Sequence, residues 1–311
     1  MKKPFNTAPF YALLAILGIA TTFNGCKKDE KDEKNDPVPP KVYRMNNIEY
    51  QEDGDTYVNK ITYSADNKLT MLTEIENGVE VYRNNWVWNG NEVTINEQML
   101  EEGIWITDES SREKLIYTGG HLSESQYFYN DTLASKVTYT WNGNQLTNES
   151  MNYYHADTIA WSYSVNYIYE GAKLMRADWY SMGLLVQKQV IEYQDDKPVA
   201  LKSYDHNNVL NESSELAYTN GNITTINYFH VIEGVQGDTD CTETRVYDVN
   251  NCATNISTAC SEDYAYTSKI TYEEGAGNFN DFLLVNVSWI SVYLFPDTFP
   301  SELAYKKKKK K

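Results

Sequence analysis

A motif that recurs about every 25 residues limits the possible folds of this chain more than any other feature. In each copy an aromatic residue is followed by two or three turn-forming residues and then by an aliphatic one. WNGNEV (Trp88–Val93) and WNGNQL (Trp141–Leu146) are clear examples. Successive aromatic residues lie 24 to 29 positions apart, at Tyr63, Trp88, Tyr117, Trp141, Tyr169, Tyr193, Tyr218, Tyr247 and Tyr272. This regular period predicts a tandem array of small structural units.

Each copy has the pattern of a β-hairpin. The Asn-Gly and Gly-Asn pairs supply the positive φ angles that tight hairpin turns require. The preceding segments, such as KITY and KVTYTW, are rich in β-branched and aromatic residues. A second polar turn, such as YNDTLAS, closes each unit, and no stretch after residue 25 has helical periodicity. We therefore predict an all-β domain over residues 41–305, built as an antiparallel meander of about nine tandem hairpins.

The number of hairpins predicts the shape of the sheet. Nine hairpins supply about 18 strands, and open twisted sheets rarely exceed ~10 strands. Closure also removes the unpaired edges of a sheet. We therefore expect the sheet to be curled or closed into a large barrel. A pore through the outer membrane is the alternative, but segments such as Leu146–Tyr153 carry polar residues on both faces. A lipid-facing strand needs an apolar face.

The N-terminus has the layout of a lipoprotein signal. Lys2 and Lys3 precede an apolar run from Phe10 to Ala20, which is too short to span a bilayer. Gly25 and Cys26 follow, and then the charged stretch KKDEKDEKND. We predict a signal peptide over residues 1–25, a lipid on Cys26, and a charged, disordered tether over residues 26–40. An ordinary signal peptide with an incidental cysteine is the alternative.

These features resemble two known groups. The signal and the lysine-acid run resemble those of lipoproteins of the Bacteroidetes. This resemblance implies palmitate on Cys26 and a location at the outer membrane. It also implies display on the cell surface, with the periplasmic face as the alternative. The repeats over residues 58–280 resemble YD or Rhs repeats, and they also resemble a Bacteroidetes lipoprotein family of unknown function described as porin-like in fold. Neither resemblance carries catalytic residues.

Two threonines match a modification motif. Asp-Thr-Leu around Thr132 and Asp-Thr-Ile around Thr158 resemble the Bacteroidetes O-glycosylation motif, which implies a glycan on each. Both motifs fall in polar turns of the repeat array. We therefore expect the two modified residues at equivalent positions of two units.

The net charge excludes one class of partner. The chain carries 27 basic and 44 acidic residues. Without Lys2, Lys3 and the tail Lys306–Lys311, 19 basic residues stand against 44 acidic ones, a net charge of −25. Nucleic-acid binding requires clustered basic residues and is therefore not expected.

The lysine tail, residues 306–311, is a tag, a frameshifted end or a functional basic tail. Residues 282–295 are apolar in both alternating phases, which predicts a strand or hairpin covered on both sides.

Three cysteines follow Cys26. Export favours disulfides, and Cys241 and Cys260 lie symmetrically about a turn, so they face each other across the predicted hairpin. Cys252 with Cys260 is the alternative pair. The three lack the close spacing of structural zinc ligands, so we predict no metal. We predict no cofactor either.

No catalytic motif occurs in the sequence. The adjacent acids Glu101–Glu102, Asp195–Asp196 and Glu273–Glu274 are candidates for the paired carboxylates of a glycan-degrading hydrolase, but with 44 acidic residues chance pairs are expected and solvated turns explain them better. The seven tryptophans offer sugar-stacking surfaces or cross-strand packing pairs. We therefore expect a non-enzymatic envelope lipoprotein, held in the outer-membrane lipid through Cys26, that binds a glycan or an envelope protein. The hydrolase and an outer-membrane pore or shell component are the alternatives.

Overall fold

The computed structural model describes residues 41–52, 55–261 and 265–277. Within these ranges the chain forms one sheet of 19 strands. None of the described residues belongs to a helix that could cross a membrane. The predicted signal peptide, Cys26, the predicted tether, the apolar segment 282–295 and the lysine tail lie outside the described residues. The strands are β1 (Tyr43–Glu52), β2 (Asp55–Tyr63), β3 (Leu69–Glu76), β4 (Val79–Asn89), β5 (Glu92–Glu101), β6 (Ile104–Thr107), β7 (Ser111–Thr118), β8 (His121–Tyr129), β9 (Thr132–Asn142), β10 (Gln145–His155), β11 (Thr158–Glu170), β12 (Lys173–Ser181), β13 (Leu184–Gln194), β14 (Lys197–Asp205), β15 (Leu210–Thr219), β16 (Asn222–Ile232), β17 (Val235–Tyr247), β18 (Ala253–Cys260) and β19 (Ala265–Glu274).

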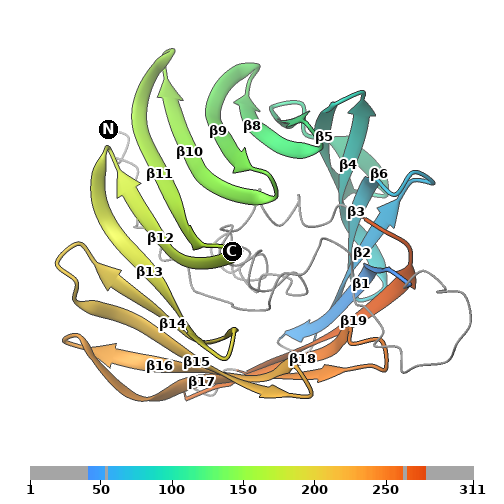
Figure 1. Cartoon of the computed structure of the whole chain (residues 1–311). Coiled ribbons are helices and arrows are strands. Elements are labelled where there is room, and N and C mark those ends of the chain that lie inside the picture. The colour runs from blue at the N-terminus through green and yellow to red at the C-terminus, as the bar shows by residue number, and fades with distance from the viewer. Residues whose placement is uncertain (1–40, 53–54, 262–264, 278–311) are drawn as a thin grey trace, which may run out of the picture.

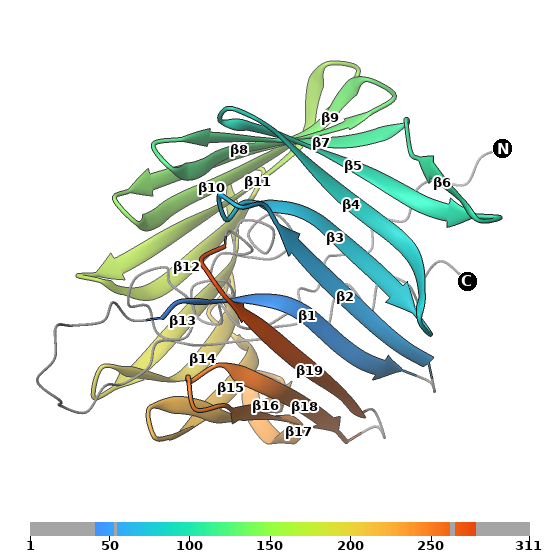
Figure 2. The same ribbon diagram turned by 90° about the vertical axis from the view of Figure 1, so that its right-hand side faces the viewer.

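The strands form a closed antiparallel meander (Figures 1 and 2). Each strand pairs with the next one in the sequence, except that β7 pairs with β5 and not with β6. β1 pairs with both β2 and β19, which closes the sheet. The barrel wall has 18 strands, because β6 and β7 follow one another along the same edge of β5. The predicted fold class is confirmed, including the closure that the number of hairpins favours.

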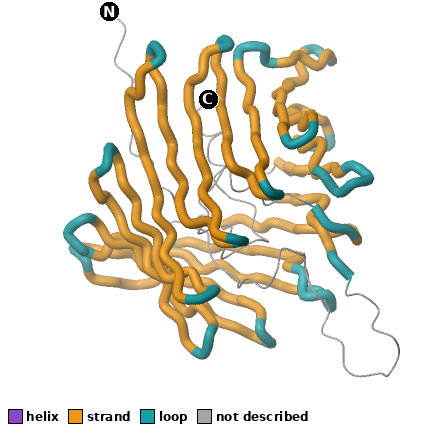
Figure 3. The backbone as a smooth tube through the Cα atoms, turned by 45° about the horizontal axis from the view of Figure 1, so that its top comes forward, coloured by secondary structure: helices purple, strands orange, loops and turns teal. Residues whose placement is uncertain are grey.

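The hairpin turns lie at two ends of the barrel (Figure 3). We call the end that carries the turns after the aromatic residues of the motif the aromatic rim, and the opposite end the far rim. The far rim holds two-residue turns such as Asn77–Gly78, with φ angles of 49° and 83°. These left-handed angles match the twist of the flanking strands and explain the Asn-Gly pair at this turn.

The ninth hairpin is divided between the two ends of the domain. In the first unit Tyr63 of β2 faces Leu69 of β3. In the last, Tyr272 of β19 faces Met45 of β1. Met45 therefore takes the aliphatic position of the ninth unit, although it precedes the first complete motif. The barrel contains nine equivalent hairpins, eight of them continuous in the chain.

Arg44 fastens this closing pair of strands. Its guanidinium lies 2.7 Å from a carboxylate oxygen of Glu273 on β19 and donates hydrogen bonds to Asn67 and to the backbone oxygen of Ala276. The guanidinium carbon also lies 4.2 Å from the ring centroid of Tyr63. One half-buried side chain thus connects β19, β1 and the first complete unit.

A hydrogen bond between neighbouring units accounts for the aromatic residue of the motif. The hydroxyl or indole N–H of one unit donates to the backbone oxygen of the aliphatic position in the preceding unit, so it links two hairpins. We call this bond the latch. It measures 2.7–2.9 Å in Tyr63 to Met45, Trp88 to Leu69, Trp141 to Leu122, Tyr169 to Leu146, Tyr193 to Leu174, Tyr218 to Pro198 and Tyr272 to Ala253.

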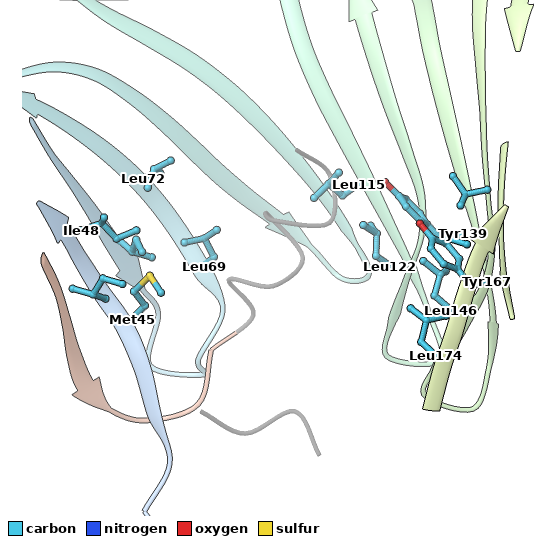
Figure 4. Packing of buried hydrophobic residues seen from close by; sticks show 14 of the residues in the cluster. Met45, Ile48, Leu69, Leu72, Leu115, Leu122, Tyr139, Leu146, Tyr167 and Leu174 are labelled. Atoms are coloured by element: carbon cyan, nitrogen blue, oxygen red, sulfur yellow. The ribbon is translucent and has the colours of Figure 1, made fainter. Parts of the chain in front are cut away.

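The aliphatic residues of the motif form the core on the inner face of the barrel. Leu69, Leu122, Leu146 and Leu174 are almost fully buried. Figure 4 shows Leu122, Leu146 and Leu174 following one another around the wall, on the alternate strands β8, β10 and β12. Burial of a leucine side chain contributes roughly 1.5–3 kcal/mol to stability, so this ring provides much of the driving force for closure.

Cys241 and Cys260 occupy facing positions on β17 and β18. Their sulfur atoms are bonded at 2.04 Å. The bond joins the two strands of one hairpin at its far-rim end, as expected from their symmetric placement about the turn. Cys252 is buried at the aromatic rim, and it does not take part in this disulfide.

We predict that Tyr193→Phe lowers the free energy of unfolding by about 1 kcal/mol, because it removes one latch and leaves the ring in place. Tyr180 provides the control: it lies on the outer face of β12, opposite Ser164. Tyr180→Phe is expected to change stability by less than about 0.5 kcal/mol. Urea denaturation of both variants measures the difference, and equal effects would contradict a specific role for the latch.

Candidate functional site

The inner wall of the barrel changes character from one rim to the other. Two residues before each motif aromatic the side chains are apolar or aromatic in eight units: Ile61, Trp86, Leu115, Tyr139, Tyr167, Ile191, Leu216 and Ile270; the ninth is Arg245. Four residues before it they are mostly polar: Asn59, Asn84, Glu113, Val137, Val165, Gln189, Ser214, Glu243 and Ser268. The half of the wall near the far rim is therefore polar, except at Val137 and Val165.

Around this exception the wall carries a run of aromatic rings, Tyr153, Trp161, Tyr163 and Trp179, which we call the aromatic ladder. Successive ring centroids lie 5.2, 5.9 and 5.2 Å apart. The rings come from β10, β11 and β12, and the strand register sets their spacing, since Tyr153 faces Trp161 and Val165 faces Trp179. The ladder is a continuous aromatic surface on the inner wall near the far rim.

Hydrogen bonds fix the two indoles of the ladder. The Trp161 indole N–H donates to the Ser181 hydroxyl at 3.0 Å, and that of Trp179 donates to the Gln189 amide oxygen at 3.1 Å. Trp161 is nevertheless 38% exposed. A ring that is held in place and still open to solvent is suited to stacking on a ligand.

A buried carboxyl lies beside the ladder. Glu149 of β10 faces Tyr139 of β9, and the Tyr167 hydroxyl donates to it at 3.0 Å. Burial raises the pKa of Glu149 to about 7, against the opposing effect of that hydrogen bond. The pKa of Tyr163 is also raised, first by burial and then by the negative charge of Glu149. Glu149 can therefore donate or accept a hydrogen bond near neutral pH.

Two further carboxyls of the wall share this behaviour. Burial raises the pKa of Glu113 on β7 to about 7, and the negative charge of Glu97 contributes to the rise, whereas the Ser125 hydroxyl opposes it. Burial also raises the pKa of Glu212 on β15 to about 7. Glu243 and Arg245 on β17, both nearly fully buried, form an ion pair at 2.7 Å. The sequence alone did not single out any of these residues.

The tryptophans divide between packing and exposure. Trp86 is buried in the core, and Trp88 and Trp141 form latches, so these three confirm the packing interpretation. The guanidinium of Arg83 lies over the ring of Trp105, with its carbon atom 3.8 Å from the ring centroid. Trp289 lies outside the described residues. Among the tryptophans that the structure describes, Trp161 is the most exposed.

The adjacent acids lie in exposed positions. Glu101 and Glu102 lie at the turn between β5 and β6, and Asp196 pairs with Lys173 at the aromatic rim. Glu273 and Glu274 pair with Arg44 and Lys41 at the closing strands. The structure therefore places these acids in turns and ion pairs, and in no case in a shared concave site.

The described residues contain no cluster of three or more His, Cys, Asp or Glu side chains that could hold a metal ion. Thr132 and Thr158 begin β9 and β11, and both are exposed at the far rim. They therefore occupy equivalent turns of two units, which is where an O-linked glycan would be accessible.

Comparison with known proteins gives a resemblance in fold only. No protein-family model matches the chain, and no curated protein does. Among solved structures it is similar to a porin-like protein from Bacteroides uniformis, with 12% identity, coverage of 74% of this chain and 96% of that one, and a TM-score of 0.42. It is also similar to a porin-like protein from Bacteroides vulgatus, with 12% identity, coverage of 74% and 98%, and a TM-score of 0.32. We draw no function from these similarities.

We predict that the protein becomes less stable as the pH rises from about 4.5 to about 7. Glu113, Glu149 and Glu212 each have a folded-state pKa of about 7, above the ordinary value of 4.5, so the contribution of each is full at low pH and is lost as the pH rises through 7. A shift of this size corresponds to at most about 3 kcal/mol for one group. Glu149→Gln should reduce this slope, measured by urea denaturation at pH 5 and pH 8. An unchanged slope would contradict burial of an uncharged Glu149.

Proposed function

We propose that the protein is a non-enzymatic cell-envelope lipoprotein whose barrel binds a glycan at the aromatic ladder. The supporting observation is the ladder itself, four rings at stacking distance with the exposed Trp161 among them. Aromatic faces stack on the C–H-rich faces of sugar rings, and a few placed polar groups orient the ligand. Glu149, Ser181 and Gln189 provide such groups beside the rings.

The outer face of the barrel supports a body that is not embedded in lipid. Lys114 pairs with Glu92 at 2.8 Å, and Lys202 pairs with Glu192 at 2.7 Å. Both lysines precede or follow a fully buried leucine on the same strand, so they point outward. A barrel in a bilayer carries an apolar outer band, and a lysine near its midplane costs about 2–4 kcal/mol. These ion pairs argue for the lipoprotein interpretation and against the pore.

The attachment point of the chain supports display of the ladder. Lys41 pairs with Glu274, and the Gly275 N–H donates to the Val42 backbone oxygen, both at the aromatic rim. The segment before Lys41 therefore joins the barrel at that rim. With a lipid on Cys26, the aromatic rim would face the membrane, and the ladder, Thr132 and Thr158 would lie at the end away from it.

We predict that the protein retains neutral oligosaccharides on a printed glycan array, and that Trp161→Ala weakens this binding by at least about tenfold. Tyr180→Ala on the outer face of β12 is the matched control and should bind as the wild type does. The bound oligosaccharide should be recovered intact by mass spectrometry. An empty array, equal binding by both variants, or a cleaved ligand would overturn the proposal.

We also predict that Cys26→Ser releases the protein from the membrane fraction. Lipidation of this cysteine would be the attachment, so its loss should move the protein to the soluble fraction after export. Immunoblotting of fractions from the native host measures the change, and mass spectrometry of the wild type checks for the lipid. A Cys26→Ser variant that resists alkaline carbonate extraction would instead indicate an integral membrane protein.

A further inference from the structure

The barrel has one strand edge that the described residues leave unpaired. In the described part of the chain every other strand has a neighbour on each side, whereas β6 pairs only with β5. β6 exists because the chain turns at Glu102–Gly103, with φ angles of 50° and 81°, and then breaks at Asp108 before β7 begins. The carboxylate of Asp108 accepts hydrogen bonds from Ser110 and Ser111, which fixes this break. Figure 2 shows β6 beside the end of β5, apart from the other strands of the wall.

This strand lacks the features that usually protect an edge. Its residues, Ile104 to Thr107, carry no charge and include no proline. Ile104 is 68% exposed and Ile106 is 46% exposed, and Met99, which faces Ile106 from β5, is 48% exposed. These three side chains share one face. An uncharged edge with an exposed apolar face is a template for an added strand.

The register shows which backbone groups are available. Glu101 and Ile104 close the two-residue turn, and the Asp108 N–H donates to the Glu97 backbone oxygen at 2.9 Å. Hydrogen-bonded pairs alternate along an antiparallel ladder, so the backbone groups of Ile104 and Ile106 point to β5. Those of Trp105 and Thr107 point away from β5 to the unpaired edge.

The acidic residues around β6 favour a partner segment that carries basic residues. The edge is flanked by Glu101 and Glu102 on one side and by Asp108 and Glu109 on the other, in a body whose net charge is −25 once Lys2, Lys3 and the lysine tail are set aside. A second copy of this chain would bring the same acids together. We propose that β6 binds an extended segment of another protein, with alternating apolar residues at its centre and basic residues at both ends, as an added antiparallel strand.

The test uses the whole mature protein and a labelled peptide, Lys-Lys-Thr-Val-Thr-Val-Thr-Lys-Lys, with fluorescence anisotropy as the readout. We expect saturable binding that weakens as salt is added. The same peptide with glutamate in place of lysine should bind at least about tenfold more weakly, because its charges oppose those of the edge. Glu101→Gln with Glu102→Gln should reduce the difference between the two peptides.

A proline substitution distinguishes strand addition at the β6 edge from non-specific binding of the peptide. Thr107→Pro removes an N–H that points away from β5, so the β5–β6 ladder keeps its bonds. It also removes the hydroxyl that accepts from the Gln98 amide at 3.0 Å, and Thr107→Ala controls for that loss. We expect Thr107→Pro to weaken peptide binding at least about tenfold and Thr107→Ala to preserve it.

Three results would overturn the proposal. They are absence of saturable peptide binding by the wild type, equal binding by Thr107→Pro, and a wild-type dimer in sedimentation that Thr107→Pro converts to a monomer. The last would identify a second copy as the occupant. None of these depends on the aromatic ladder, so the glycan proposal and this one fail independently.

Discussion

The barrel depends on the hydrogen bond by which an aromatic side chain of one hairpin reaches the backbone of the hairpin before it. A two-stranded hairpin is marginally stable alone, and the strand ladder by itself does not determine which hairpin follows which. The latch adds a directional hydrogen bond between equivalent positions of neighbouring units, as between the Tyr193 hydroxyl and the Leu174 backbone oxygen. Either a phenol or an indole can make it, which explains why both tyrosine and tryptophan occur at one position of the motif. The aliphatic residue that supplies the acceptor oxygen is also the residue that fills the core.

Much of this fold was predictable from the sequence because its rules are local. The turn residues predict the hairpins, their number predicts closure, and the spacing of Cys241 and Cys260 placed them face to face. The role of Met45 was not predictable, because its partner Tyr272 lies at the other end of the domain and no motif marks it. The short strand β6 was missed for a related reason: the Asx turn at Asp108 resembles an ordinary polar loop in the sequence.

The candidate site was less accessible to sequence reasoning than the fold. Aromatic residues are so frequent in this chain that composition could not separate Trp161 from the latch residues Trp88 and Trp141. The distinction requires the register, which places Tyr153, Tyr163 and Trp179 around it. Glu149 and Arg245 stand where other units have mostly small or apolar residues, and such departures from a repeat are where function is expected. With the repeats aligned by their aromatic residues, these exceptions were visible in the sequence, although their burial was not.

The division of the ninth hairpin between β1 and β19 has a consequence for folding. Lys41 and Glu274 are 233 residues apart, so the closing contact has one of the longest sequence separations in the molecule. Contacts between neighbouring hairpins are local and form early, whereas the ring cannot close until the last strand is available. Until then β1 and β18 each present an unpaired edge, which exposes the chain to aggregation. Loss of β19 would therefore leave an open sheet with two unpaired edges, through which chains can associate with one another before they have folded.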